Sequence, residues 1–138
     1  MKISHFFYLD KEEKNVCPDA ISLSYERDWS ILHASLQSVG MICPISVRKK
    51  EGGWDIVSGK GRWLCFKGPK VPAIEVICSE REALDLNLHE NIHRGFNPVE
   101  CARIIRRLAE DFSLPLRQIG ETYAPLLGIG SGTKIVED

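Results

Sequence analysis

Two short polar runs, Ser58-Gly59-Lys60-Gly61-Arg62 and Glu90-Asn91-Ile92-His93-Arg94, carry the most information about this chain. The apolar pattern around them predicts that the first run follows a strand and that the second closes a helix. Glycines let backbone amides approach a ligand, and cations pair with phosphate. A carboxylate beside an amide offers hard oxygen ligands for Mg²⁺. The two runs therefore predict a site for a phosphorylated ligand and its metal ion.

Short elements surround the first run. They are a helix over 28–39 ended by Gly40, strands over 42–47 and 54–57 joined by a turn at 51–53, a short helix between Gly61 and Gly68, and a strand over 71–77. Pro44 cannot donate to a strand ladder, so the strand over 42–47 is expected at an edge of the sheet. The residues ahead of Asp28 are expected to form a short ordered arm.

Two helix starts follow. Ser79 with Glu82 predicts one capping box, and Asn97-Pro98 with Glu100 predicts another strong helix start. The apolar positions expected to form the buried stripe of the second helix are Val99, Ala102, Ile105, Leu108, Ala109 and Phe112. Residues 116–123 predict one more helix, and a further one begins at Thr133. Because that last helix has so few residues, we expect the chain to be part of a longer protein.

Composition argues against a strongly basic DNA-binding protein, a zinc protein and a membrane protein. The 138 residues carry a net charge of -1, so net charge gives no support to strong nonspecific DNA binding, although a local basic face stays open. The five cysteines are scattered without a Cys-x-x-Cys pair, which predicts reduced thiols, a cytoplasmic location and no zinc site. No apolar run is long enough to span a bilayer, so a membrane partner is not expected.

The order of elements and the two runs resembles the ParB-like domain of the ParB/sulfiredoxin superfamily, over roughly Asp28 to Phe112. The resemblance implies an α+β fold with a small mixed sheet, packed helices and a helical C-terminal extension. It also implies a division into an arm over 1–27, a nucleotide- or phosphate-binding core over 28–95, and an extension over 96–138 that holds a truncated helix-turn-helix.

ParB-type proteins carry Gly-Glu-Arg-Arg and Glu-Asn-x-x-Arg boxes, which in the family bind the triphosphate of CTP and its Mg²⁺. The second box is matched fully by Glu90, Asn91 and Arg94, whereas in the first Lys60 and Gly61 replace the glutamate and an arginine. The implied phosphate-binding residues are Gly59, Lys60, Gly61, Arg62 and Arg94, and the implied Mg²⁺ ligands are Glu90 and Asn91.

The implied function is a switch in a DNA-associated protein, in which a nucleotide (CTP or ATP) and Mg²⁺ bridge the two runs. Two alternatives stay open: a small-molecule phosphotransferase with Glu90 as general base, and a degenerate scaffold for protein contacts. Nucleotide hydrolysis of the CTPase type and a homodimer also stay open. Nuclease activity is not expected, since no cluster of carboxylates and histidines resembles a two-metal site. His89 and His93 are interpreted as surface residues.

The family also binds DNA through helices that follow the second box. The remnants of a helix-turn-helix are placed at Gln118–Glu121 and Thr133–Val136, and DNA is the expected partner of the full-length protein. Candidate contacts to DNA phosphates are Arg103, Arg106, Arg107 and Arg117, with a solvated helix face as the alternative.

Overall fold

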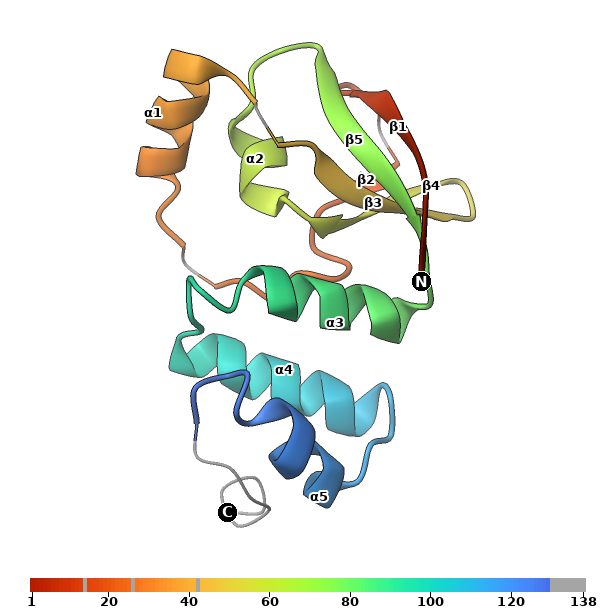
Figure 1. Cartoon of the computed structure of the whole chain (residues 1–138), viewed down its shortest axis with the longest axis vertical. Coiled ribbons are helices and arrows are strands. Elements are labelled where there is room, and N and C mark those ends of the chain that lie inside the picture. Colours follow the sequence, from red (N-terminus) through yellow and green to blue (C-terminus); the bar gives the residue numbers. More distant parts are fainter. Residues whose placement is uncertain (14, 26, 42, 130–138) are drawn as a thin grey trace. The chain divides into compact units, whose positions relative to one another are not determined.

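The computed structural model describes residues 1–129 except 14, 26 and 42, and it has a mixed α+β architecture, as predicted (Figure 1). Its elements are β1 (Lys2–Asp10), β2 (Val16–Cys17), α1 (Ser30–Val39), β3 (Ile45–Lys50), β4 (Gly53–Ser58), α2 (Lys60–Cys65), β5 (Lys70–Ile77), α3 (Glu80–Glu90), α4 (Pro98–Glu110), α5 (Leu116–Gln118) and the π-helical turn η1 (Ile119–Tyr123).

The chain divides into two compact units. The first runs from Met1 to Ser22 and continues up to Asn87 after the short segment Leu23–Tyr25. The second holds that segment together with the chain from Leu88 onward. The boundary therefore falls inside α3, and the two polar runs belong to different units.

The first unit is built on a five-stranded sheet with the order β1-β5-β3-β4-β2. Strand β3 pairs antiparallel with β4 and parallel with β5, so it is central. The expectation of an edge strand was wrong, because Pro44 lies just before Ile45, the first residue of β3. Its missing N–H therefore falls outside the ladder and costs no strand pairing.

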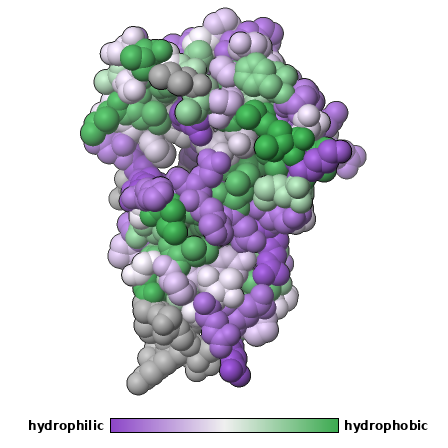
Figure 2. Space-filling model, in the orientation of Figure 1, coloured by the Kyte–Doolittle hydropathy of each residue, from purple (hydrophilic) through white to green (hydrophobic). Residues whose placement is uncertain are grey.

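Residues 2–10, within the expected arm, form β1, which pairs antiparallel with β5. Leu9 of this strand is buried, and the Phe7 ring lies 5.1 Å from that of Trp54. Ile3 and Phe6 are exposed, and Figure 2 shows hydrophobic side chains gathered over β1. From Phe6 to Asp10, exposed positions alternate with the half-buried Phe7 and the buried Leu9, as is typical of an antiparallel strand with one face on a core.

Helix α2 packs its Trp63 side chain into the core that the sheet supplies. The other members of that buried cluster are Leu9, Ile45, Val47, Ile56, Val71 and Ala73. Helix α1 contacts α2 but has no fully buried residue. The short helix after the first run is thus fixed on one side by the sheet and on the other by α1, which fixes the geometry of the glycine loop.

In the second unit, α4 begins at the predicted position with Asn97 as the N-cap and Glu100 completing a capping box. The predicted buried stripe was right in part. Leu108 is buried as predicted, but Val99 and Ala102 are exposed, and Glu100, Cys101 and Ile104 are buried instead. Both faces of this helix carry apolar residues, so their spacing alone could not select the face that packs against the rest of the unit.

The predicted helix over 116–123 is present as α5 followed by η1, with Ile119 and Tyr123 buried. The second expected remnant of a helix-turn-helix, Thr133–Val136, lies outside the described residues. Among the helices that the structure describes, none is long and apolar enough to cross a membrane.

Candidate functional site

The first polar run forms the turn from β4 into α2. Gly59 is the N-cap of α2 and has a φ of 99°, a conformation that side chains rarely adopt. A Cβ atom on Gly59 would also lie 2.6 Å from Cγ2 of Ile45. Because both the backbone conformation and the space exclude a side chain, glycine is required at this position for the fold itself.

Gly61 has a different reason for lacking a side chain. It is buried in α2, and a Cβ atom there would lie 2.8 Å from the Trp29 ring and from Leu32. The glycine therefore allows α1 and α2 to approach each other closely. This packing role was not expected from the sequence, which suggested only the approach of a phosphate.

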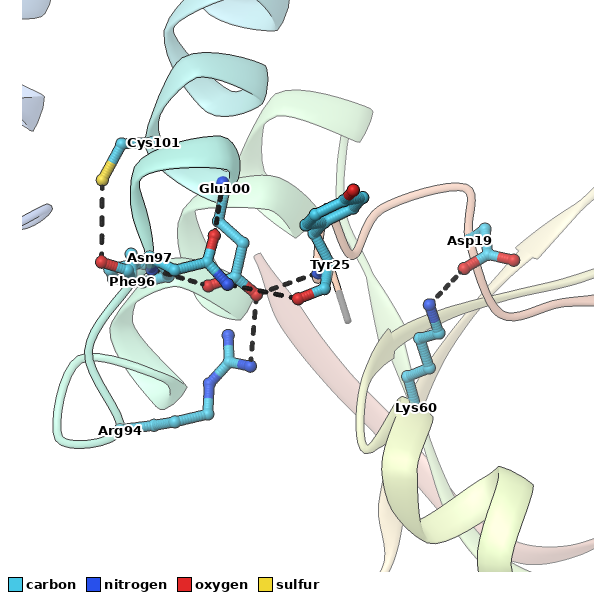
Figure 3. A network of polar contacts seen from close by, with 8 residues as sticks. All are labelled: Asp19, Tyr25, Lys60, Arg94, Phe96, Asn97, Glu100 and Cys101. Carbon is cyan, nitrogen blue, oxygen red and sulfur yellow. Dashed lines mark hydrogen bonds and ion pairs between the residues drawn. The ribbon is translucent and has the colours of Figure 1, made fainter. Parts of the chain in front are cut away.

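The two cations of the first run already have protein partners. Nη1 of Arg62 donates hydrogen bonds to the carbonyl oxygens of Cys43 and Pro44, at 2.8 and 2.9 Å. Nζ of Lys60 lies 2.5 Å from Oδ1 of Asp19 (Figure 3). Arg62 thereby holds the segment that leads into β3. The ammonium of Lys60 is paired with the Asp19 carboxylate, so an incoming phosphate would have to displace that carboxylate or share the ammonium with it.

The second polar run closes α3 and continues into a turn. Glu90 is the last residue of α3 and is exposed, and Asn91 is the first residue of the turn. A carboxylate at this end of a helix faces the negative end of the helix dipole, where a cation is favoured instead. The side chains of Glu90 and Asn91 are adjacent in sequence and each has an oxygen that can bind a metal ion. Such a pair suits Mg²⁺ when phosphates and water supply the remaining ligands.

The histidines beside Glu90 lie at the surface. His89 and His93 are both exposed, in agreement with their interpretation as surface residues. In the part of the chain that the structure describes, no group of three or more histidine, cysteine, aspartate or glutamate side chains could hold a metal ion.

Arg94, the third residue of the second box, contacts a buried carboxylate. Its Nη1 lies 3.5 Å from Oε2 of Glu100, whose side chain is 1% exposed. The same Oε2 accepts a hydrogen bond from the backbone N–H of Tyr25, and Oε1 accepts one from the N–H of Asn97. Figure 3 shows these groups gathered around the Glu100 carboxylate.

Sequence reasoning recognised Glu100 only as part of a capping motif. Its contact with Tyr25 spans 75 residues along the chain, so no local pattern could reveal it. Arg94 is only 6 residues away but lies in the turn before α4. The one available signal was that the capping glutamate follows Arg94 closely in sequence.

The thiol of Cys101 lies next to this network. It donates to the carbonyl oxygens of Phe96 and Leu127, at 3.9 and 3.7 Å. Burial, with a further contribution from the charge of Glu100, raises the pKa of the Cys101 thiol. Burial and these two contacts make Cys101 a packing residue of the second unit.

The arginines proposed to contact DNA are partly neutralised by acidic neighbours. Ion pairs one helical turn apart join Arg106 to Glu110, Arg107 to Asp111 and Arg117 to Glu121. The guanidinium of Arg103 lies 4.6 Å above the centre of the Tyr25 ring. An open hollow of about 280 Å³ is lined by Leu23, Arg103, Arg106, Arg107, Glu110 and Asp111.

The ParB N-terminal domain model matches residues 20–92 of the chain, a range that includes the glycine loop, Glu90 and Asn91. The chain is 36% identical over 92 residues to the chromosome-partitioning protein ParB of Myxococcus xanthus, covering 64% of this chain and 31% of that protein. It is 36% identical over 89 residues to the chromosome-partitioning protein Spo0J of Thermus thermophilus, covering 62% and 33%. The chain thus spans about a third of the length of these relatives.

Solved structures of ParB proteins share the fold. One is a C-terminally truncated ParB from Caulobacter crescentus complexed with CTP-γ-S, with a TM-score of 0.55 and 24% identity, covering 92% of this chain and 73% of that one. Another is a C-terminally truncated ParB from the same organism complexed to the centromeric parS site, with a TM-score of 0.55 and 23% identity, covering 97% and 68%.

Proposed function

Since the chain belongs to the ParB N-terminal domain family, we propose that it binds a nucleotide with Mg²⁺ as a conformational switch in a DNA-associated protein. The observation that carries the proposal is the family match over residues 20–92, which includes the first run, Glu90 and Asn91, together with the intact Glu90-Asn91-x-x-Arg94 box. A relative of the same fold was solved with CTP-γ-S, which makes CTP the first ligand to test.

In this proposal the first run contributes backbone and charge. The N–H groups at the start of α2 and the cations Lys60 and Arg62 face the phosphates, as the family box implies. Lys60 would be drawn from Asp19 towards the ligand, whereas Arg62 keeps its two carbonyl partners and fixes the loop. Gly61 takes the place of a family arginine, so one phosphate contact found in the family is lost here.

The second run contributes metal ligands and one strong cation. Glu90 and Asn91 hold Mg²⁺, and Arg94 pairs with the phosphates. The metal would neutralise part of the phosphate charge. Glu90, at the negative end of α3, gains a favourable cation when Mg²⁺ is present.

DNA association is the second part of the proposal. A relative of the same fold was solved on a parS site. The candidate residues on this chain are Arg103, Arg106, Arg107 and Arg117. Contacts to phosphate would compete with the internal acidic partners of three of them, so DNA binding through this face alone is expected to be weak and strongly dependent on salt. The division into an arm, a core over 28–95 and a helical extension remains part of the proposal.

The deciding experiment is a calorimetric titration of the chain with CTP, ATP, GTP and UTP, each with and without Mg²⁺. We expect Mg²⁺-dependent binding of CTP. Arg94→Ala should weaken that binding at least about tenfold, because a charge-assisted contact to phosphate is lost. Arg117→Ala is the matched control, since Arg117 is 81% exposed and pairs only across one helical turn with Glu121.

The outcomes separate the candidate functions. Selective binding of ATP would favour the phosphotransferase alternative, which turnover of a hydroxyl-bearing small molecule would then test. No binding of any nucleotide would overturn the switch and favour a scaffold for protein contacts. An Arg94→Ala variant that binds as tightly as the wild type would remove Arg94 from the proposed site.

A further inference from the structure

Two capping boxes of the same chemistry occur in this chain, and they differ in burial. In α3, Glu82 accepts from the N–H of Ser79 at 3.0 Å, and its side chain is 46% exposed. In α4, Glu100 accepts from the N–H of Asn97 at the same distance, but its side chain is 1% exposed. A cap works equally well at the surface, so capping does not explain why Glu100 is buried.

The second carboxylate oxygen of Glu100 accounts for the difference. Oε2 accepts from the N–H of Tyr25 at 3.1 Å and lies 3.5 Å from Nη1 of Arg94. A buried carboxylate is costly unless hydrogen bonds and an opposite charge compensate it. Two backbone N–H groups supply the hydrogen bonds, and Arg94 supplies the charge. Because both N–H groups are on the main chain, the carboxylate has a fixed position.

The Arg94 guanidinium is therefore paired with a carboxylate whose own position is fixed. Its guanidinium also lies 5.8 Å from the centre of the Phe96 ring, a contact that further restricts the side chain. A guanidinium presents five N–H donors in a rigid plane, enough to serve a carboxylate on one edge and a phosphate on another. A long side chain that is ordered before the ligand arrives loses less conformational freedom on binding.

We propose that Glu100 is a positioning residue, which holds the Arg94 guanidinium in the orientation that receives the phosphates of the nucleotide. This inference rests on the proposed function, in which Arg94 contacts the ligand. It adds a residue outside both polar runs and outside the range of the family match, residues 20–92. The role belongs to the charge and the second oxygen of Glu100, not to its cap.

Glu100→Gln tests the proposal, because glutamine keeps the size of the side chain and can still accept the capping hydrogen bond. We expect it to weaken Mg²⁺-dependent CTP binding about tenfold, by calorimetry, relative to the wild type. Glu82→Gln is the matched control and should leave CTP binding unchanged, since it removes the same charge from the other capping box. The double variant Arg94→Ala/Glu100→Gln should bind CTP no more weakly than Arg94→Ala alone.

Each outcome has a defined meaning. An unchanged affinity in Glu100→Gln overturns the positioning role while leaving the proposed function intact. So does an added loss in the Arg94→Ala background, since Glu100 would then act by another route. A wild-type chain that binds no nucleotide overturns the proposed function and this inference with it. If circular dichroism shows that Glu100→Gln does not fold, Glu100→Asp replaces it: its shorter carboxylate keeps the charge but falls short of Arg94, so the same tenfold loss is expected, and unchanged affinity overturns the proposal.

Discussion

The two polar runs look alike in sequence, but the structure uses them differently. Residues of the first run are part of the framework: Gly61 lets two helices pack, and Arg62 fastens the segment before β3. The second run is an exposed helix end, in which Glu90 contributes little to packing. The difference shows that residues matching a binding motif also serve the fold to different degrees. Gly61 and Arg62 do so in the first run. In the second run Arg94 pairs with the buried Glu100, whereas Glu90 is exposed at the end of its helix.

The largest expected effect on stability concerns Gly59 of the first run. Gly59→Ala should lower the free energy of unfolding by about 3 kcal/mol, since it combines a left-handed backbone with a steric clash against Ile45. Gly95→Ala, directly after the second run, is the control. Gly95 has a φ of 78° but nothing within 4 Å of an added Cβ, so the expected loss is about 1 kcal/mol.

Urea denaturation monitored by circular dichroism measures both variants, with the slope of the transition checking that two-state behaviour is kept. Equal losses of unfolding free energy in Gly59→Ala and Gly95→Ala would contradict the contrast between the two runs. They would mean that Gly59 is needed only for its backbone conformation and not for close packing.

An intermediate effect is expected for Arg62→Ala. The substitution leaves the carbonyl groups of Cys43 and Pro44 without this donor and should cost about 2 kcal/mol of stability before any ligand is added. The same urea titration measures this variant. If Arg62→Ala keeps the full free energy of unfolding, Arg62 does not stabilise the fold and is better assigned to the ligand site.

The smallest expected effect on stability concerns Glu90 of the second run. Glu90→Gln removes a negative charge from the C-terminal end of α3, so stability should rise by about 0.3 kcal/mol. The same variant should reduce the dependence of nucleotide affinity on Mg²⁺, measured by calorimetry at several Mg²⁺ concentrations. A loss of stability above about 1 kcal/mol would place Glu90 in the framework as well.

Local sequence determined much of this protein. Both capping boxes, the turn between β3 and β4, the strand β5 and the helical nature of residues 116–123 follow from residue types at short spacing, and the structure confirms them. These features depend on hydrogen bonds and dihedral preferences within a few residues, so the order of the chain is enough to specify them.

Tertiary structure alone decided the rest. The pairing of β1 with β5, the central place of β3 and the contact of Glu100 with Tyr25 join residues far apart in the chain. The buried face of α4 was chosen between two apolar faces. Side chains that are equivalent in sequence, such as Glu82 and Glu100, then differ in burial. The physical reason is that the energy of a buried charge or an apolar face is set by what packs against it, and the sequence near a residue does not specify that neighbour.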